Sequence, residues 1–211
     1  TPGGPVLVGV ENPDHGRQLV RTAGDLAHLG DGTVRLVTVA AKPHDSPFGV
    51  FSDETIRGHY AAESHALLDR VAVPTDVTVE RDVVVARSVA RDLLDAVAET
   101  NPAALVVGWQ DRSRPRDVVL GTTVDTLVAR APCDLYVERV GREANGVGSV
   151  LLPVAGGPHV AAAARVAGAV ATRNDARVHV CSVYASDGDP AAAQQFVDAG
   201  REALSSVAPD V

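Results

Sequence analysis

The sequence predicts an α/β fold with a doubly wound, parallel five-stranded sheet, followed by a partial second copy. Two observations carry this prediction. Short valine-rich runs alternate with longer amphipathic stretches in the order βαβαβαβαβ, and strands that alternate with helices form a mostly parallel sheet covered on both faces. The same pattern then restarts at Val150.

The individual elements follow from hydrophobic periodicity. Strands are expected where apolar residues run together or alternate, and helices where they recur every three or four residues. The expected strands are 6–10, 34–39, 77–85, 103–107 and 135–140. The expected helices are one around 19–27 that ends at Gly30-Asp31-Gly32, one from Ser52 or Asp53 to about Arg70, and then 88–100 and 122–131. Right-handed crossovers between these elements give a Rossmann-like layer.

An internal repeat sets the domain organisation. VLVGVENPDH at 6–15 aligns with VLLPVAGGPH at 150–159, and the same offset places Val34 and Val39 on Val178 and Val183 without a gap. We therefore expect a complete domain at 1–141, a linker at 142–148, and the βαβα part of a second domain at 149–211. The absence of an initiator methionine is expected of a piece of a longer protein, and the second copy is expected to be truncated or completed by a partner.

Composition narrows the class of protein. The net charge of −8 argues against a nucleic-acid binder, which normally presents a basic face. Apolar residues make up 45% of the chain, yet no run approaches the roughly 20 that a membrane helix needs. The two cysteines lack a CxxC partner, so a reduced cytoplasmic compartment is expected. A single lysine with abundant aspartate fits either a salt-adapted (halophilic) protein or a GC-rich genome.

The stretch GWQDRSRPRDVVLGTT, residues 108–123, lies where a doubly wound sheet binds ligands, beyond the carboxyl ends of its strands. One interpretation is a phosphate cradle, because glycine allows close backbone approach and a helix start offers free N–H groups. The other is a turn without a ligand, in which Thr122 and Asp125 form a capping box. In that case Arg112 and Arg114 are solvated or pair with neighbouring aspartates.

These residues resemble the universal stress protein family. Its pattern is a glycine, two residues, a glycine, nine residues, and then Gly-Ser or Gly-Thr after the fourth strand. Here Gly108 and Gly121-Thr122 match in identity and spacing, whereas Asp111 replaces the middle glycine. The resemblance covers 5–140 and, in part, 149–211, and it implies the adenine nucleotide alpha hydrolase-like version of the fold.

The resemblance also implies a nucleotide site for ATP or AMP, with Mg²⁺ accompanying ATP. Glu11 matches the acidic residue that holds the ribose or adenine side, and Val39 matches a backbone contact to adenine. The phosphates are expected along Gly108, Asp111, Gly121, Thr122 and Thr123. Asp111 would repel a phosphate about 4 Å away by roughly 4 kcal/mol at an effective dielectric of about 20, and Arg112, Arg114 and Arg116 are the expected compensation.

The expected function is regulatory rather than enzymatic, because the chain has no GxSxG elbow and no metal-ligand spacing. The segments VVLGTTVDTLV and APCDL resemble soluble modules fused behind archaeal amino-acid permeases, which implies a transporter tail at the cytoplasmic face of the membrane. The alternatives are a free-standing tandem stress protein, and a scaffold that binds no nucleotide and pairs as a homodimer or pseudo-dimer through Leu135–Val140.

Overall fold

The computed structural model describes residues 3–41, 53–86, 88–110, 121–141 and 146–211. The chain separates into two compact units, Thr1–Glu143 and Ala144–Val211, and each is described by itself. No helix within the described ranges is both long and apolar enough to cross a membrane.

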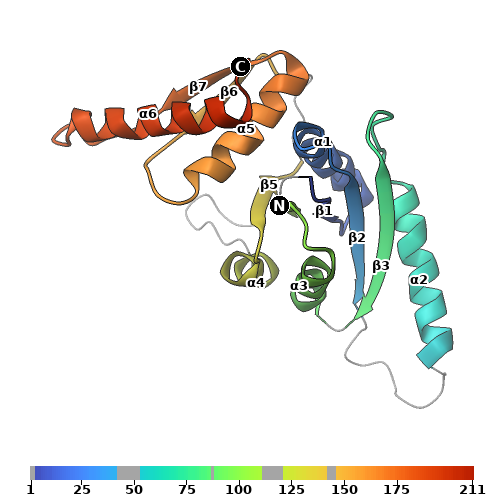
Figure 1. The fold of residues 1–211 in the computed structure, drawn as a ribbon. Coiled ribbons are helices and arrows are strands. Elements are labelled where there is room, and N and C mark those ends of the chain that lie inside the picture. The colour runs from blue at the N-terminus through green and yellow to red at the C-terminus, as the bar shows by residue number, and fades with distance from the viewer. Residues whose placement is uncertain (1–2, 42–52, 87, 111–120, 142–145) are drawn as a thin grey trace. The chain divides into compact units, whose positions relative to one another are not determined.

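The first unit contains a five-stranded parallel sheet with the strand order β3-β2-β1-β4-β5 (Figure 1). The predicted α/β, doubly wound fold is therefore confirmed. Its elements are β1 (Val6–Gly9), α1 (Pro13–Leu29), β2 (Val34–Ala41), α2 (Asp53–Asp69), β3 (Val79–Ala86), α3 (Val89–Thr100), β4 (Ala104–Trp109), α4 (Thr122–Arg130) and β5 (Asp134–Arg139).

Local sequence explains where the first and third helices begin. Asn12 caps α1, since its side chain accepts a hydrogen bond from the Asp14 amide at 2.9 Å, and proline follows at the first helical position. Ser88 caps α3 in the same way, and the carboxylate of Asp92 accepts from the Ser88 amide at 3.2 Å. This reciprocal pair resembles a capping box, with the carboxylate one residue later than the usual third helical position.

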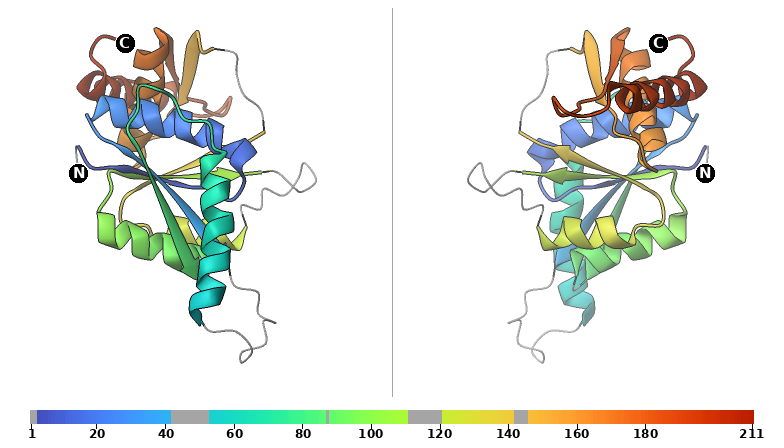
Figure 2. Two further views of the ribbon diagram at one scale, coloured as in Figure 1. Left: turned by 90° about the vertical axis from the view of Figure 1, so that its right-hand side faces the viewer. Right: turned by 90° about the vertical axis from the view of Figure 1, so that its left-hand side faces the viewer.

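The helices cover both faces of the sheet. Figure 2 shows α1 on one face, and α3 and α4 on the other. The α3 and α4 face buries Leu7 and Val37 of the sheet beneath Leu93, Val97 and Leu127 of the helices. Because side chains alternate along each strand, the neighbouring residues point to the opposite face, so both faces of the sheet are apolar.

Each strand differs from the sequence prediction by one or two residues at one or both ends, and two of these differences bear on the site. β3 begins at Val79 rather than Val77, and β4 extends to Trp109 rather than ending at Val107. Hydrophobicity alone placed Gly108 and Trp109 in a loop. In the structure they pair with Glu138 and Arg139 of β5, because backbone hydrogen bonds rather than side-chain polarity define the end of a strand.

The second unit holds a two-stranded parallel sheet and two helices. Its elements are β6 (Ser149–Pro153), α5 (Val160–Asn174), β7 (Arg177–Cys181) and α6 (Pro190–Val207). Its core packs Leu152 and Val154 against Ala164, Ala167 and Leu204, with Val150, Val178 and Val180 at the margin. Small residues allow the helices to approach closely, since a Cβ on Gly168 would lie 2.9 Å from the Ala208 Cβ.

Candidate functional site

The carboxyl ends of the parallel strands meet at one edge of the first sheet, and most predicted site residues lie there. Glu11 follows β1 and is exposed, whereas Val39 lies in the carboxyl half of β2 and is half-buried against the core. β1 and β4 are neighbours with Gly9 opposite Val107. The order in which successive strands are added to the sheet reverses between these two parallel strands, and this is the position where open α/β sheets bind ligands.

The helix α4 begins at this edge with Gly121, Thr122 and Thr123. Gly121 is the N-cap with φ 90° and ψ 155°, a backbone region that is essentially restricted to glycine. A side-chain Cβ built there would find open space, because no atom lies within 4 Å. The amides of the first turn therefore start from an uncrowded backbone position of the kind that lets an anion approach a helix N-terminus.

The capping-box interpretation of Thr122 and Asp125 is wrong. Thr122 is the first helical residue rather than the N-cap, and no described side chain caps α4. Thr122 instead accepts a hydrogen bond at its carbonyl from the Thr126 hydroxyl at 2.7 Å. The sequence Gly121-Thr122 is therefore not explained by a side-chain cap of α4, which was the interpretation that needed no ligand.

The helices α1 and α3 differ from α4 in that their own side chains cap their N-termini. Asn12 and Ser88 satisfy the first amides of α1 and α3 with their own side chains, and Asp14 and Asp92 add negative charge to those first turns. A bound anion would have to displace those contacts. Of the three helices of this sheet whose N-cap residue is described, α4 has the N-terminus best suited to an external anion, and Asp125 in its first turn opposes one.

Gly108 has a structural role that the sequence motif did not reveal. A Cβ at this position would lie 3.1 Å from Val140 Cγ1 and 3.4 Å from Leu19 Cδ1. A larger residue would therefore crowd the side chains of α1 and of the residue after β5 that pack on β4, so glycine has a packing role there whether or not a ligand binds. Asp111, Arg112 and Arg114 lie outside the described residues.

A polar network beside this edge was missed by sequence reasoning. Gln18 of α1 is only 9% exposed, and its Nε2 donates to Glu138 Oε1 at 2.7 Å and to the Arg139 carbonyl at 3.0 Å. The Gly141 amide donates to Gln18 Oε1 at 3.2 Å. The sequence feature that could have predicted this buried side chain is the position of Gln18 directly before the apolar pair Leu19-Val20 of the helix.

The same strand end holds Trp109. The Arg139 guanidinium lies 5.9 Å from the centroid of the Trp109 ring, within the range of a cation–π interaction. Trp109 is half-buried, so its ring does not project fully into solvent.

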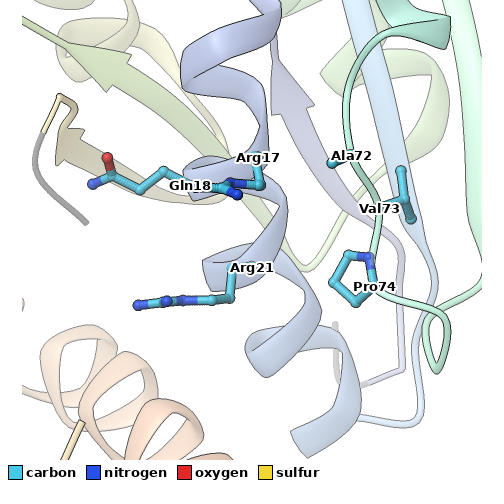
Figure 3. A pocket seen from close by; sticks show the side chains of 6 residues that line it. All are labelled: Arg17, Gln18, Arg21, Ala72, Val73 and Pro74. Atoms are coloured by element: carbon cyan, nitrogen blue, oxygen red, sulfur yellow. The ribbon is translucent and has the colours of Figure 1, made fainter. Parts of the chain in front are cut away.

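A shallow cavity of about 320 Å³ lies elsewhere, along α1 (Figure 3). Its lining residues are Arg17, Gln18, Arg21, Ala72, Val73 and Pro74. Figure 3 shows the Arg21 side chain extending away from Pro74, and none of the predicted site residues lines the cavity. The described residues also contain no group of three potential metal-ligating side chains.

Comparison with known proteins finds a family match for the first unit. The model of the universal stress protein family matches residues 4–139. No curated protein matches the chain.

Three solved structures illustrate the similarity. A universal stress protein from Lactobacillus plantarum is 18% identical, with a TM-score of 0.52, over 66% of this chain and 99% of that one. A functionally unknown protein from Pseudomonas aeruginosa PAO1 is 15% identical, with a TM-score of 0.56, over 96% of this chain and 67% of its own. A universal stress protein in complex with cAMP is 18% identical, with a TM-score of 0.46, over 67% of this chain and 100% of that chain. The first two support the α/β fold.

Proposed function

Because this chain belongs to the universal stress protein family, we propose that it is a regulatory module that senses an adenine nucleotide at the carboxyl edge of its first sheet. The observation that carries the proposal is the start of α4. Gly121 adopts a conformation restricted to glycine, and no described side chain caps the helix, in contrast to Asn12 in α1. Phosphates accept hydrogen bonds from such free amides and are attracted by the helix dipole.

In this arrangement the amides of Thr122 and Thr123 hold the phosphates of ATP or AMP. Glu11 accepts from the ribose hydroxyls, and the backbone near Val39 contacts adenine. Gly108 keeps the end of β4 close to α1, so the floor of the site is fixed by packing. Asp111 opposes a phosphate by charge repulsion, and Arg112 and Arg114 supply the compensating charge.

Calorimetric titration of ATP–Mg and of AMP into the full chain tests the proposal. Thr122→Glu places a carboxylate at the exposed start of α4, so we expect it to weaken binding by about tenfold or more. Ala129→Glu adds the same charge at an exposed position near the other end of α4 and is expected to bind like the native chain.

Asp111→Gly restores the family glycine and is expected to bind more tightly than the native protein, because a like charge is removed. Binding by this variant alone would mean that the cradle is switched off in the native chain. Absence of binding to both proteins would overturn the nucleotide proposal.

Assembly is the second candidate function. β5 forms an edge of the five-stranded sheet, so its outer backbone groups are available for pairing with a second chain or a second domain. In this alternative the module is a scaffold that pairs through Leu135–Val140 and binds no nucleotide. Sedimentation velocity with and without ATP distinguishes the two: a dimer that is indifferent to nucleotide supports the scaffold, and a monomer at all concentrations excludes it.

The location and attachment of the module are part of the same proposal. We place it in the cytoplasm, at the cytoplasmic face of the membrane if it is the tail of an amino-acid transporter, and assign it no catalytic step. Reading the gene upstream of Thr1 tests the attachment, since a permease reading frame there supports it and an unrelated one contradicts it. A phosphate-release assay with ATP tests the absence of catalysis.

A further inference from the structure

The strands β4 and β5 end side by side, and their last residues form a cation–aromatic pair at the carboxyl edge of the first sheet. Trp109 lies opposite Arg139 in the parallel register, and the Arg139 guanidinium is 5.9 Å from the centroid of the Trp109 ring. The face of an indole ring attracts a guanidinium. The ring therefore favours one location for this positive charge at the edge.

The pair lies on the face of the sheet that α3 and α4 cover. Val107 of β4 and Val137 of β5 pack in the apolar cluster that contains Leu127 of α4. Successive side chains of a strand point to opposite faces, so residues two apart share a face. Trp109 and Arg139 each follow two residues after those valines and therefore point to the side of α4.

The start of α4 lies at the same edge as this pair. α4 ends at Arg130 and β5 begins at Asp134, so the helix runs back along the strand that follows it. From Arg130 back to Thr122 the helix spans about 12 Å, and from Asp134 to Arg139 the strand advances about 16 Å. The first turn of α4 and the end of β5 are therefore close to level along the strand direction.

The strand order gives a nucleotide a direction along this edge. In the proposed site Val39 of β2 contacts adenine, Glu11 after β1 holds the ribose, and Thr122 at the start of α4 holds phosphate. β5 lies next to β4 on the side away from β1 and β2, about 5 Å further from the nucleoside end. The single phosphate of AMP ends before β5, whereas the further phosphates of ATP extend toward Arg139.

We propose that Arg139, held in place by Trp109, binds the terminal phosphates of ATP and makes the site distinguish ATP from AMP. The inference rests on the proposed nucleotide site and adds a specificity-determining residue to it. A guanidinium has five N–H donors, so Arg139 can keep its existing contacts within the protein and still donate to a phosphate. Trp109 is a positioning residue, since it acts through Arg139.

Calorimetric titrations of ATP and of AMP into the full chain, both with Mg²⁺, test this role of Arg139. The native chain is expected to bind ATP at least about tenfold more tightly than AMP, because a hydrogen bond between charged groups contributes about that factor. Arg139→Gln is expected to lose about tenfold in ATP affinity and much less in AMP affinity, so the ratio of the two affinities falls toward one.

Arg130→Gln is the matched control. It removes the same charge from an exposed arginine in the last turn of α4, at the opposite edge of the sheet. This variant is expected to keep the native ratio of ATP to AMP affinity. Circular dichroism checks that each variant folds.

Two variants of Trp109 separate its positioning role from a general role in folding. Trp109→Ala is expected to lower the ratio of ATP to AMP affinity, because Arg139 loses the ring that holds it. Trp109→Phe retains an aromatic face and is expected to restore most of the ratio.

Two results would contradict the contact between Arg139 and ATP while leaving the nucleotide site in place. One is equal affinity of the native chain for ATP and AMP, and the other is an unchanged ratio in Arg139→Gln. If the native chain binds neither nucleotide, the nucleotide site itself is wrong and the role of Arg139 is overturned with it.

Discussion

Gln18 and Glu138, 120 residues apart along the chain, join α1 to β5 through a hydrogen bond of 2.7 Å from the glutamine Nε2 to the carboxylate. The same amide side chain also bonds the Arg139 carbonyl and the Gly141 amide. One buried side chain thus positions the strand end that carries Val140, which in turn packs against Gly108 beside the candidate site.

Replacing Gln18 by leucine is expected to lower the free energy of unfolding of the first unit by about 1–3 kcal/mol, because a partly buried carboxylate loses a donor. Urea denaturation followed by the fluorescence of Trp109, the single tryptophan, reports on this unit. Gln194→Leu is the matched control, since Gln194 donates to Asp198 at 2.9 Å at an exposed position. Because Gln194 lies in the second unit and Trp109 in the first, the two variants are compared by circular dichroism. Gln194→Leu should change the free energy of unfolding by no more than about 0.5 kcal/mol. Equal losses would show that burial of the Gln18 network contributes nothing.

Gly121→Ala is expected to lower stability by about 1–3 kcal/mol, although no atom obstructs the new methyl group, because an alanine cannot adopt the Gly121 backbone angles without strain. Gly58→Ala serves as the control: Gly58 lies inside α2, also without neighbours within 4 Å, and its φ is not positive. We expect Gly58→Ala to stabilise by roughly 0.5–1 kcal/mol. Thermal unfolding of the two variants measures the difference. A stable Gly121→Ala protein would mean that the turn before α4 rearranges easily.

Gly108→Ala is expected to cost about 1–3 kcal/mol through overpacking against Val140 and Leu19. Trimming Val140 to alanine removes the nearest atom, so the double variant should be less destabilised than the sum of the single variants. A double-mutant cycle from urea melts measures this coupling. Strict additivity would mean that the Val140 side chain moves aside without cost, and that Gly108 is not explained by packing.

Burial raises the pKa of the Cys133 thiol, and the neighbouring Asp134 carboxylate raises it further. A group whose pKa is raised in the folded state contributes stability below its unfolded pKa, and that contribution is lost as the pH rises through the folded pKa. We therefore expect the free energy of unfolding to fall above about pH 8.5, the ordinary thiol value, and to fall less in Cys133→Ala. Denaturation curves between pH 7 and 10 provide the comparison. Parallel curves for the two proteins would show that the thiol does not titrate differently on folding.

The periodicity of apolar residues was sufficient to predict the layers of helices and sheet in the first unit. The apolar residues whose helical spacing predicted the first helix are all buried: Leu19, Val20, Ala23, Leu26 and Ala27. The glycine and threonine spacing predicted that a helix begins at residue 122, as α4 does. The strand ends and the capping of α4 were predicted incorrectly, because both depend on backbone hydrogen bonds that polarity patterns do not record.

The amino-acid sequence by itself determined the order of strands and helices, the internal repeat and the family, since each of these is written in local residue patterns. Only the tertiary structure decided that Gln18 bonds β5, that Gly108 is constrained by Val140, and that Leu151 is exposed while its counterpart Leu7 is buried. Leu7 and Leu151 lie in nearly the same local sequence. Leu7 is buried because α3, α4 and β4, which come from far along the chain, cover its face of the first sheet and pair with its strand.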